Sequence, residues 1–362
     1  MMNTKNTGRG LLKRASYAAV LGAILFAAGY GVYASGAIGA LYSKVTGQIV
    51  EKPADIPYSR KDMEAARIAY ARDPSAAPPQ MPVGADGYYL PPAESDIPDG
   101  PYGDAIKRGR AIFMNPGLMA KDHVGNSLAC VNCHIDAGRR ENSAPMWAAY
   151  SAYPAFRKKT GSVSTLEDRI MGCFTYSMNA QASPSGVAPP AGGDIYRDLI
   201  TYMSWLADGA PAGTKLRGKA YPKVPKPEHD YDIHRGFVVF QQNCALCHGT
   251  DGQGTRDEAG KVKFPPLWGP ESYNWGAGMA RIDTAAGFIK ANMPLGKPYS
   301  LTDQEAWDVA AFINSHERPK DPRQKGTVAE ATEKYHAGEK SFYGKVVDGQ
   351  LRGVGTDVQA GR

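Results

Sequence analysis

The sequence is poor in cysteine, in net charge and in the alternating pattern of β-strands, and each shortage excludes a class of protein. Five cysteines in 362 residues are too few for a disulfide-stapled scaffold of this length. The net charge of +6 is not gathered into a basic block, as nucleic-acid-binding proteins usually require, so we expect no nucleic-acid partner. Apolar residues at 43% and charged residues at 22% exclude a wholly disordered chain, and the length allows two domains.

The N-terminus combines a basic start with a long uncharged run. Positions 1–14 hold four basic residues and no acidic one, and positions 15–42 hold no charged residue at all. This pattern is typical of an export signal. The 28 uncharged residues also suffice to span a bilayer, so residues 1–42 are predicted to be either a cleaved signal peptide or a membrane anchor. In both cases we expect a periplasmic protein, either soluble after cleavage or held at the inner membrane through residues 15–42.

Proline and polar composition divide the rest of the chain. Residues 43–103 contain ten prolines from position 51 onward and are predicted to be extended. A second proline-rich stretch marks residues 211–231 as a linker, and residues 319–362 form a polar segment without helical periodicity, which we interpret as a tail. Residues 104–210 and 232–318 remain as two candidate domains.

The two candidate domains follow one helical plan. Each begins with Arg-Gly-x-x-x-Phe, at 108–113 and 235–240, and each ends in a pattern with apolar residues three or four positions apart. The last helix is predicted to begin at a capping box formed by Thr302 and Glu305. Because alternating strand patterns are scarce, we predict an all-α fold with two tandem domains after an export or anchor segment and a proline-rich linker.

Each domain also carries the sequence Cys-x-x-Cys-His, at 130–134 and 244–248. This is the attachment sequence for c-type haem: the two thiols reach the two porphyrin vinyl groups, and the histidine becomes the proximal iron ligand. A zinc ribbon would place its cysteine pairs about 15–20 residues apart, whereas 110 residues separate them here. A thioredoxin-type pair would need a βαβ unit that the sequence lacks. We therefore predict two cytochrome c domains with two covalently attached haem c groups, held by Cys130, Cys133, Cys244 and Cys247, with His134 and His248 as proximal ligands.

Two sulfur-containing residues are candidates for the remaining axial positions. Met293, followed by a proline, lies downstream of His248, where small cytochromes c supply a distal thioether; the alternative is a core methionine. Cys173 lies outside both attachment motifs, on a helix predicted to start at a capping box of Ser164 and Glu167.

The surroundings of Cys173 suggest a reactive side chain. Arg169, Cys173 and Ser177 are four residues apart and share one helix face. An arginine one turn away favours the thiolate form, which ligates iron and attacks sulfur. The alternative is an inert buried cysteine.

The sequence resembles the dihaem thiosulfate dehydrogenase family over about residues 100–318. The first domain carries the more specific part of the resemblance. The segments that carry it are 128–138, 144–147, 153–157, 166–170, 172–179 and 202–211.

The resemblance implies oxidation of two thiosulfates to tetrathionate, or the reverse reaction. It also implies an external electron acceptor, such as another cytochrome c or a membrane redox partner. Cys173 would ligate the first iron opposite His134, and Arg157, Arg169 and Ser177 would line the substrate site. Met293 would be the distal ligand of the second iron, with Lys290 and Asn292 beside it and Lys290 as an alternate ligand.

Three other functions stay open from the residues themselves. One is a non-catalytic dihaem cytochrome that carries electrons for another periplasmic or membrane enzyme. Another is an enzyme that acts on a related substrate, such as a carrier-bound sulfur species. The third is an anchored cytochrome whose N-terminal segment docks a partner subunit.

Overall fold

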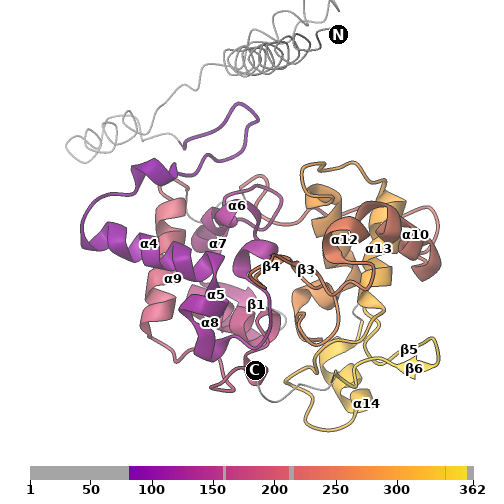
Figure 1. Cartoon of the computed structure of the whole chain (residues 1–362). Helices are drawn as coiled ribbons and strands as arrows, with labels where there is room; N and C mark the ends of the chain where they lie inside the picture. The colour runs from indigo at the N-terminus through magenta and orange to yellow at the C-terminus, as the bar shows by residue number, and fades with distance from the viewer. Residues whose placement is uncertain (1–80, 158–159, 212–215, 339, 357–362) are drawn as a thin grey trace, which may run out of the picture. The chain divides into compact units, whose positions relative to one another are not determined.

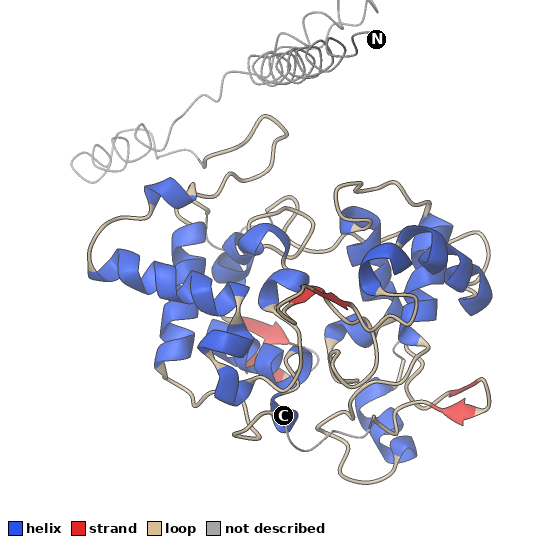
Figure 2. Cartoon of the chain, in the orientation of Figure 1, coloured by secondary structure: helices blue, strands red, loops and turns tan. Residues whose placement is uncertain are grey.

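The computed structural model describes residues 81–157, 160–211, 216–338 and 340–356, so the predicted export or anchor segment lies outside the described residues. The described part is mainly helical, as predicted, with three small antiparallel sheets (Figure 2). None of its helices is long and apolar enough to cross a membrane. The strand pairs are β1 (Ala155–Arg157) with β2 (Ser162–Ser164), β3 (Thr255–Arg256) with β4 (Val262–Phe264), and β5 (Val346–Val347) with β6 (Gln350–Leu351).

The helices form a first and a second domain along the chain (Figure 1). The first domain comprises α4 (Pro101–Met114), α5 (Pro116–Met119), α6 (Ile135–Gly138), α7 (Met146–Ala152), α8 (Leu166–Gly172) and α9 (Asp194–Leu206). The second comprises α10 (Ile233–Asn243), α11 (Ala245–His248), α12 (Ile282–Asn292) and α13 (Asp303–Asn314). A further short helix, α14 (Val328–Ala331), follows them.

The first and last helices of each domain cross at a glycine. In the first domain Gly109 of α4 lies so close to α9 that an added Cβ would sit 2.0 Å from the Asp198 carbonyl oxygen. In the second domain a Cβ on Gly236 of α10 would sit 2.1 Å from the Asp308 carbonyl oxygen of α13. Only a residue without a side chain allows this approach, which explains the glycine in both copies of the Arg-Gly motif.

The arginine of each motif forms an ion pair across the same two helices that cross at the glycine. Arg108 bonds both carboxylate oxygens of Asp198 through Nε and Nη2, at 2.7 and 3.0 Å. Arg235 bonds both carboxylate oxygens of Asp308 in the same way, at 2.7 and 2.9 Å. In each pair the carboxylate is buried and the guanidinium is partly exposed, which gives a two-pronged, charge-assisted contact. The internal repeat is therefore a repeat of structure as well as of sequence.

The two predicted capping boxes have different outcomes. Helix α13 starts as predicted: the Thr302 hydroxyl accepts a bond from the Glu305 amide, and the Glu305 carboxylate accepts one from the Thr302 amide. The box predicted at Ser164 and Glu167 is wrong by one residue, because Ser164 pairs with Ala155 in the sheet. The box that opens α8 is formed by Thr165 and Asp168 instead.

The segment after α13, interpreted from its composition as a polar tail, is folded where the structure describes it, at residues 319–338 and 340–356. Asp321 and His336 are buried and bond each other at 2.9 Å, and Arg352 is also buried. Tyr343 joins the apolar core of the first domain. Arg352 donates to the Ser315 carbonyl oxygen, so each of these polar side chains has a partner inside the protein. The hydropathy pattern of the segment therefore does not reveal that part of it is buried.

The core of the first domain includes residues from beyond it. Tyr273, Trp275 and Ala277, which precede α12 of the second domain, are buried in the same apolar cluster as Trp147 and Leu199. Trp275 is only 1% exposed. The two domains therefore share part of one core.

The proline-rich region is extended where the structure describes it. From residue 81 to residue 100 its regular elements are one short turn at Glu94–Asp96 and a bridge between Val83 and Tyr89. The buried Tyr89 donates its hydroxyl proton to the carbonyl oxygens of Leu206 and Asp208, at 3.0 and 2.7 Å. This part of the region is thus fastened to the end of α9.

Candidate functional site: a cavity with two thiols, an imidazole and a third cysteine

The first domain encloses a cavity of about 290 Å³ that brings its predicted site residues together. The wall contains the attachment motif, part of α8 and the π-helical turn η4 (Cys173–Ser177) that continues it. The remaining wall is largely apolar and includes Phe113, Leu199 and Met203. The predicted residues that line it are Cys130, Cys133, His134, Arg157, Arg169, Cys173 and Ser177.

The imidazole of His134 is fixed in one orientation. Its Nδ1 donates a hydrogen bond to the Ala144 carbonyl oxygen at 2.8 Å, and burial lowers its pKa to about 4. The ring is therefore neutral and keeps an acceptor at Nε2, as a metal-ligating histidine requires. The loop that supplies the carbonyl is strained, since Asn142 and Ala144 both have positive φ, at 58° and 51°.

The chemistry of the motif fits a covalently attached haem. Burial raises the pKa of Cys133 to about 12 and raises that of Cys130 as well, so both groups are neutral thiols beside the cavity. The two cysteine sulfurs lie where they can form thioethers with vinyl groups, an oriented imidazole can ligate iron, and apolar walls suit a porphyrin. Within the described ranges, no three His, Cys, Asp or Glu side chains are arranged to hold a bare metal ion.

Cys173 begins the π-helical turn and faces the same cavity. Arg169, one turn earlier on α8, donates from Nη1 to the Cys173 sulfur at 3.1 Å. The attraction of a Cys173 thiolate raises the pKa of Arg169, so the guanidinium remains charged beside it. The predicted shared face of Arg169, Cys173 and Ser177 therefore lines one wall, although the helix widens at Cys173.

The second attachment motif has the same local design. Nδ1 of His248 donates to the Pro265 carbonyl oxygen at 2.9 Å, and burial lowers the pKa of this imidazole. Burial also raises the pKa of Cys244 to about 12. Cys247 completes the motif in α11 and is partly buried. A carbonyl oxygen thus orients the histidine in both repeats.

The candidate distal residues of the second domain meet at the end of α12. Met293 follows the helix and packs against the second apolar core. The amine of Lys290 donates to the Leu301 carbonyl oxygen at 2.6 Å and lies 2.9 Å from the Asp303 carboxylate, so it is already engaged. Asn292 is buried and donates to the Asn142 carbonyl oxygen of the first domain at 3.1 Å. These three residues do not line the cavity around Cys173.

The chain matches known proteins in both domains. The SoxA/TsdA cytochrome c domain family matches residues 118–212, and the cytochrome c family matches residues 233–317. Thiosulfate dehydrogenases of Stutzerimonas stutzeri and Thiomonas intermedia are 49% and 47% identical to the chain, over 75% and 80% of its length and 86% and 91% of theirs. The chain belongs to the thiosulfate dehydrogenase family.

A solved structure of this family has the same fold. The thiosulfate dehydrogenase (TsdBA) of Marichromatium purpuratum, in its as-isolated form, is 48% identical and superposes with a TM-score of 0.72. The match covers 75% of this chain and 59% of that one, so this chain spans about three-fifths of the length of that relative. Both helical units described above are cytochrome c domains, and such domains bind haem c.

One charged residue of the cavity could not be predicted from the sequence. Lys219, in the linker after α9, lines the cavity together with Arg157 and Arg169. The linker is held there because the Gly218 carbonyl oxygen accepts a bond from the Asn142 amide at 2.7 Å. Tyr221 donates to the Cys133 carbonyl oxygen at 3.1 Å on the other side. No local signal distinguishes this lysine from others in a proline-rich linker.

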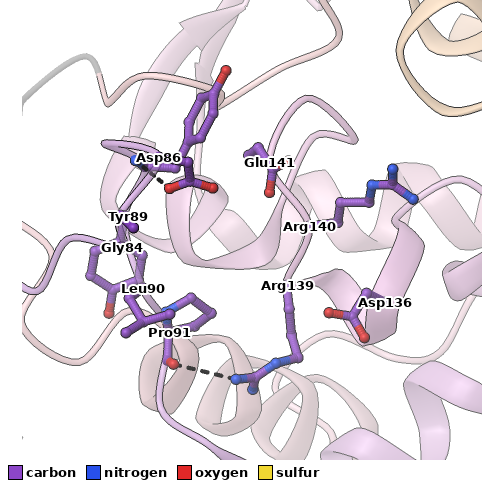
Figure 3. A pocket seen from close by; sticks show the side chains of 11 residues that line it. Gly84, Asp86, Tyr89, Leu90, Pro91, Asp136, Arg139, Arg140 and Glu141 are labelled. Atoms are coloured by element: carbon purple, nitrogen blue, oxygen red, sulfur yellow. Dashed lines mark hydrogen bonds between the residues drawn. The ribbon is translucent and has the colours of Figure 1, made fainter. Parts of the chain in front are cut away.

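The basic pair after the first motif belongs to a different cavity. Arg139 and Arg140 line a space of about 610 Å³ between residues 84–91 and 136–141 (Figure 3). Arg139 donates to the Pro91 carbonyl oxygen at 3.3 Å. Arg140 lies near Glu141 in Figure 3, on the opposite side of the view from Pro91. Neither arginine lines the cavity of Cys173, so neither contributes directly to its wall.

Proposed function

We propose that this protein reversibly oxidises two thiosulfate ions to tetrathionate in the first domain and passes two electrons through the second domain to an external acceptor. Membership in the thiosulfate dehydrogenase family supports the substrate. The observation that carries the proposal is the position of Cys173, whose sulfur accepts a bond from Arg169 in the cavity of the first attachment motif.

Each domain offers the residues needed to hold one haem c. Cys130 and Cys133 would be the thioether links of the first, and His134 and Cys173 would ligate its iron. For the second, Cys244 and Cys247 would be the thioether links, and His248 and Met293 would ligate the iron. Each haem, when bound, supplies a one-electron acceptor, and the thioether of Met293 would raise the potential of the second.

Positive charge is the main contribution of the cavity to substrate binding. Two thiosulfate dianions repel each other, and fixed cations relieve that repulsion at lower reorganisation cost than water. Arg169 is held in place beside Cys173, and the partly buried Arg157 bonds the Tyr153 hydroxyl at 3.0 Å. Lys219 provides a third cation at an exposed position. The planar guanidinium fork of arginine suits sulfonate oxygens as it suits phosphate.

Cys173 provides the covalent step. Its thiolate forms an S–S bond with the sulfane sulfur of the first thiosulfate, which releases two electrons, and the bound haem groups would be their acceptors. The sulfane sulfur of the second thiosulfate then attacks the bonded sulfane sulfur, as in thiol–disulfide exchange. The new S–S bond completes tetrathionate, the bond to Cys173 breaks, and the thiolate is regenerated without any proton transfer.

The cell compartment and the acceptor complete the proposal. Residues 1–42 would export the protein to the periplasm, as a cleaved signal or as an anchor, and they lie outside the described residues. The acceptor would be another cytochrome c or a membrane redox partner.

The test is to replace Cys173 by Gly in the holoprotein. We expect thiosulfate-dependent haem reduction and tetrathionate formation to disappear while both haems remain attached, as seen in the visible spectrum. Undiminished tetrathionate formation would rule out the covalent role of Cys173. If the unaltered protein neither reduces its haems with thiosulfate nor forms tetrathionate, the protein is an electron carrier instead.

A further inference from the structure

The carbonyl groups at the end of the cysteine-bearing turn are bonded from outside the turn. Helix ends leave carbonyl oxygens without partners in the helix. Around η4, the Thr175 carbonyl oxygen accepts a bond from the side-chain Nδ2 of Asn274 at 3.0 Å. The Tyr176 carbonyl oxygen accepts a bond from the backbone N–H of Asn274 at 3.1 Å. The Ser177 carbonyl oxygen accepts a bond from Asn126 Nδ2 at 2.7 Å.

Asn274 belongs to the part of the chain that matches the second cytochrome c domain, and it is fully buried. Its Nδ2 also bonds Asn179 Oδ1 at 3.1 Å, and its Oδ1 accepts a bond from the Gly276 amide at 3.0 Å. Asn179 has a φ of 48° and directly follows Met178, the residue after η4. One side chain therefore holds both the turn and the backbone reversal after it.

The aromatic ring on the same turn is enclosed by the second domain and the C-terminal segment. A Cβ on Gly276 would lie 2.4 Å from the Tyr176 ring, so that glycine permits close contact. On another side the guanidinium of Arg323 lies 5.4 Å from the ring centroid, and Asp321 holds Arg323 at 2.6 Å. The turn that carries Cys173 is thus in contact with Gly276 and Arg323, which lie about a hundred or more positions later in the chain.

We propose that Asn274 is a positioning residue for Cys173. By bonding the carbonyl groups of η4, it fixes the backbone so that Cys173 and Arg169 meet in the cavity, and only the cysteine side chain has to move during the reaction. The second domain therefore sets the geometry of the catalytic cysteine in addition to carrying electrons. This inference rests on the proposed role of Cys173.

The experiment compares holoproteins carrying Asn274→Ala and Ser127→Ala. The Ser127 hydroxyl donates to Glu271 at 2.6 Å and accepts from Arg256 at 3.1 Å, both in the second domain, and no hydrogen bond of its side chain goes to the turn. Ser127→Ala therefore controls for the loss of interdomain bonds. Low-temperature magnetic resonance reports the thiolate-ligated low-spin iron of the first haem, and steady-state kinetics separate kcat from KM. We expect Asn274→Ala to split or weaken the thiolate signal and to lower kcat at least tenfold, with KM changed less than twofold.

The outcomes separate this inference from the proposed function. A uniform, unaltered thiolate signal and unchanged kcat in Asn274→Ala would overturn the positioning role, as would equal spectral changes in Ser127→Ala. Absence of any thiolate signal in the unaltered protein would instead overturn the proposed ligand role of Cys173. Both Asn274→Ala and Asn274→Ser keep the backbone bond to Tyr176 and lose the side-chain bond to Thr175. If Asn274→Ala does not yield holoprotein, Asn274→Ser, which keeps a small polar side chain at this buried position, carries the same comparison.

Discussion

Replacing Arg169 by Gln should reveal how much the guanidinium contributes to the reaction. The bond from Arg169 Nη1 to the Cys173 sulfur is 3.1 Å long and partly buried. Hydrogen bonds to charged groups contribute about 1.5–3 kcal/mol, and about 1.36 kcal/mol corresponds to a factor of ten in rate. If the bond acts in the transition state, kcat/KM for thiosulfate should fall about 10- to 150-fold. Arg169→Lys should lie between Gln and the unaltered protein, because it keeps the charge and loses the planar fork.

The assay is stopped-flow reduction of the haems by thiosulfate, followed in the visible spectrum, with tetrathionate measured as product. Arg197→Gln is the matched control, since its ion pair with Asp194 is exposed on the outer surface of α9. We expect this control to react at the unaltered rate. A loss in Arg169→Gln of less than threefold, with both haems attached, would contradict the electrostatic role assigned to Arg169.

Three further changes test other parts of the structure. Lys219→Gln should raise KM for thiosulfate about two- to fivefold at low salt, because exposed charges contribute up to about 1 kcal/mol, and the difference should shrink at high salt. Gly109→Ala should lower the free energy of unfolding in urea by about 1–3 kcal/mol through overpacking against α9, whereas Gly117→Ala, with open space around it, should be neutral. Burial opposes ionisation of Asp321, but bonds from His336 and Arg323 outweigh it and lower its pKa. The folded state therefore binds fewer protons there than the unfolded chain, and this contribution is present above about pH 4 and lost as the pH falls further. Asp321→Asn should flatten the decline of the unfolding midpoint between pH 4 and pH 2.

The repeated plan of the protein was predictable because its signals are local. The Arg-Gly motifs, the apolar spacing of α9 and α13 and the capping box at Thr302 each act within a few residues or across a single helix pair. The shared face of Arg169 and Cys173 was predictable for the same reason, since residues four apart on a helix lie one turn from each other.

The remaining features depend on contacts between distant residues. The capping box lies at Thr165 and Asp168, and not at the predicted Ser164 and Glu167, because Ser164 is paired with Ala155 in a strand. The helix widens at Cys173, and Asn274, about a hundred residues later, bonds the Thr175 carbonyl oxygen of the widened turn. No sequence pattern near either residue predicts this contact. Parts of residues 319–338 and 340–356 are buried although the segment is polar, because buried polar side chains such as Asp321 and His336 bond each other. The composition of the segment predicts exposure instead.

The core shared through Tyr273 and Trp275 limits how this molecule can be dissected. A fragment that ended in the linker after α9 would lose Trp275 and leave an uncovered apolar hollow where that ring packs. A fragment that began there would present the same indole to water. We therefore expect neither fragment to keep the structure that it has in the intact protein. Measurements on a single haem are better made on the intact chain with one attachment motif disabled by substitution.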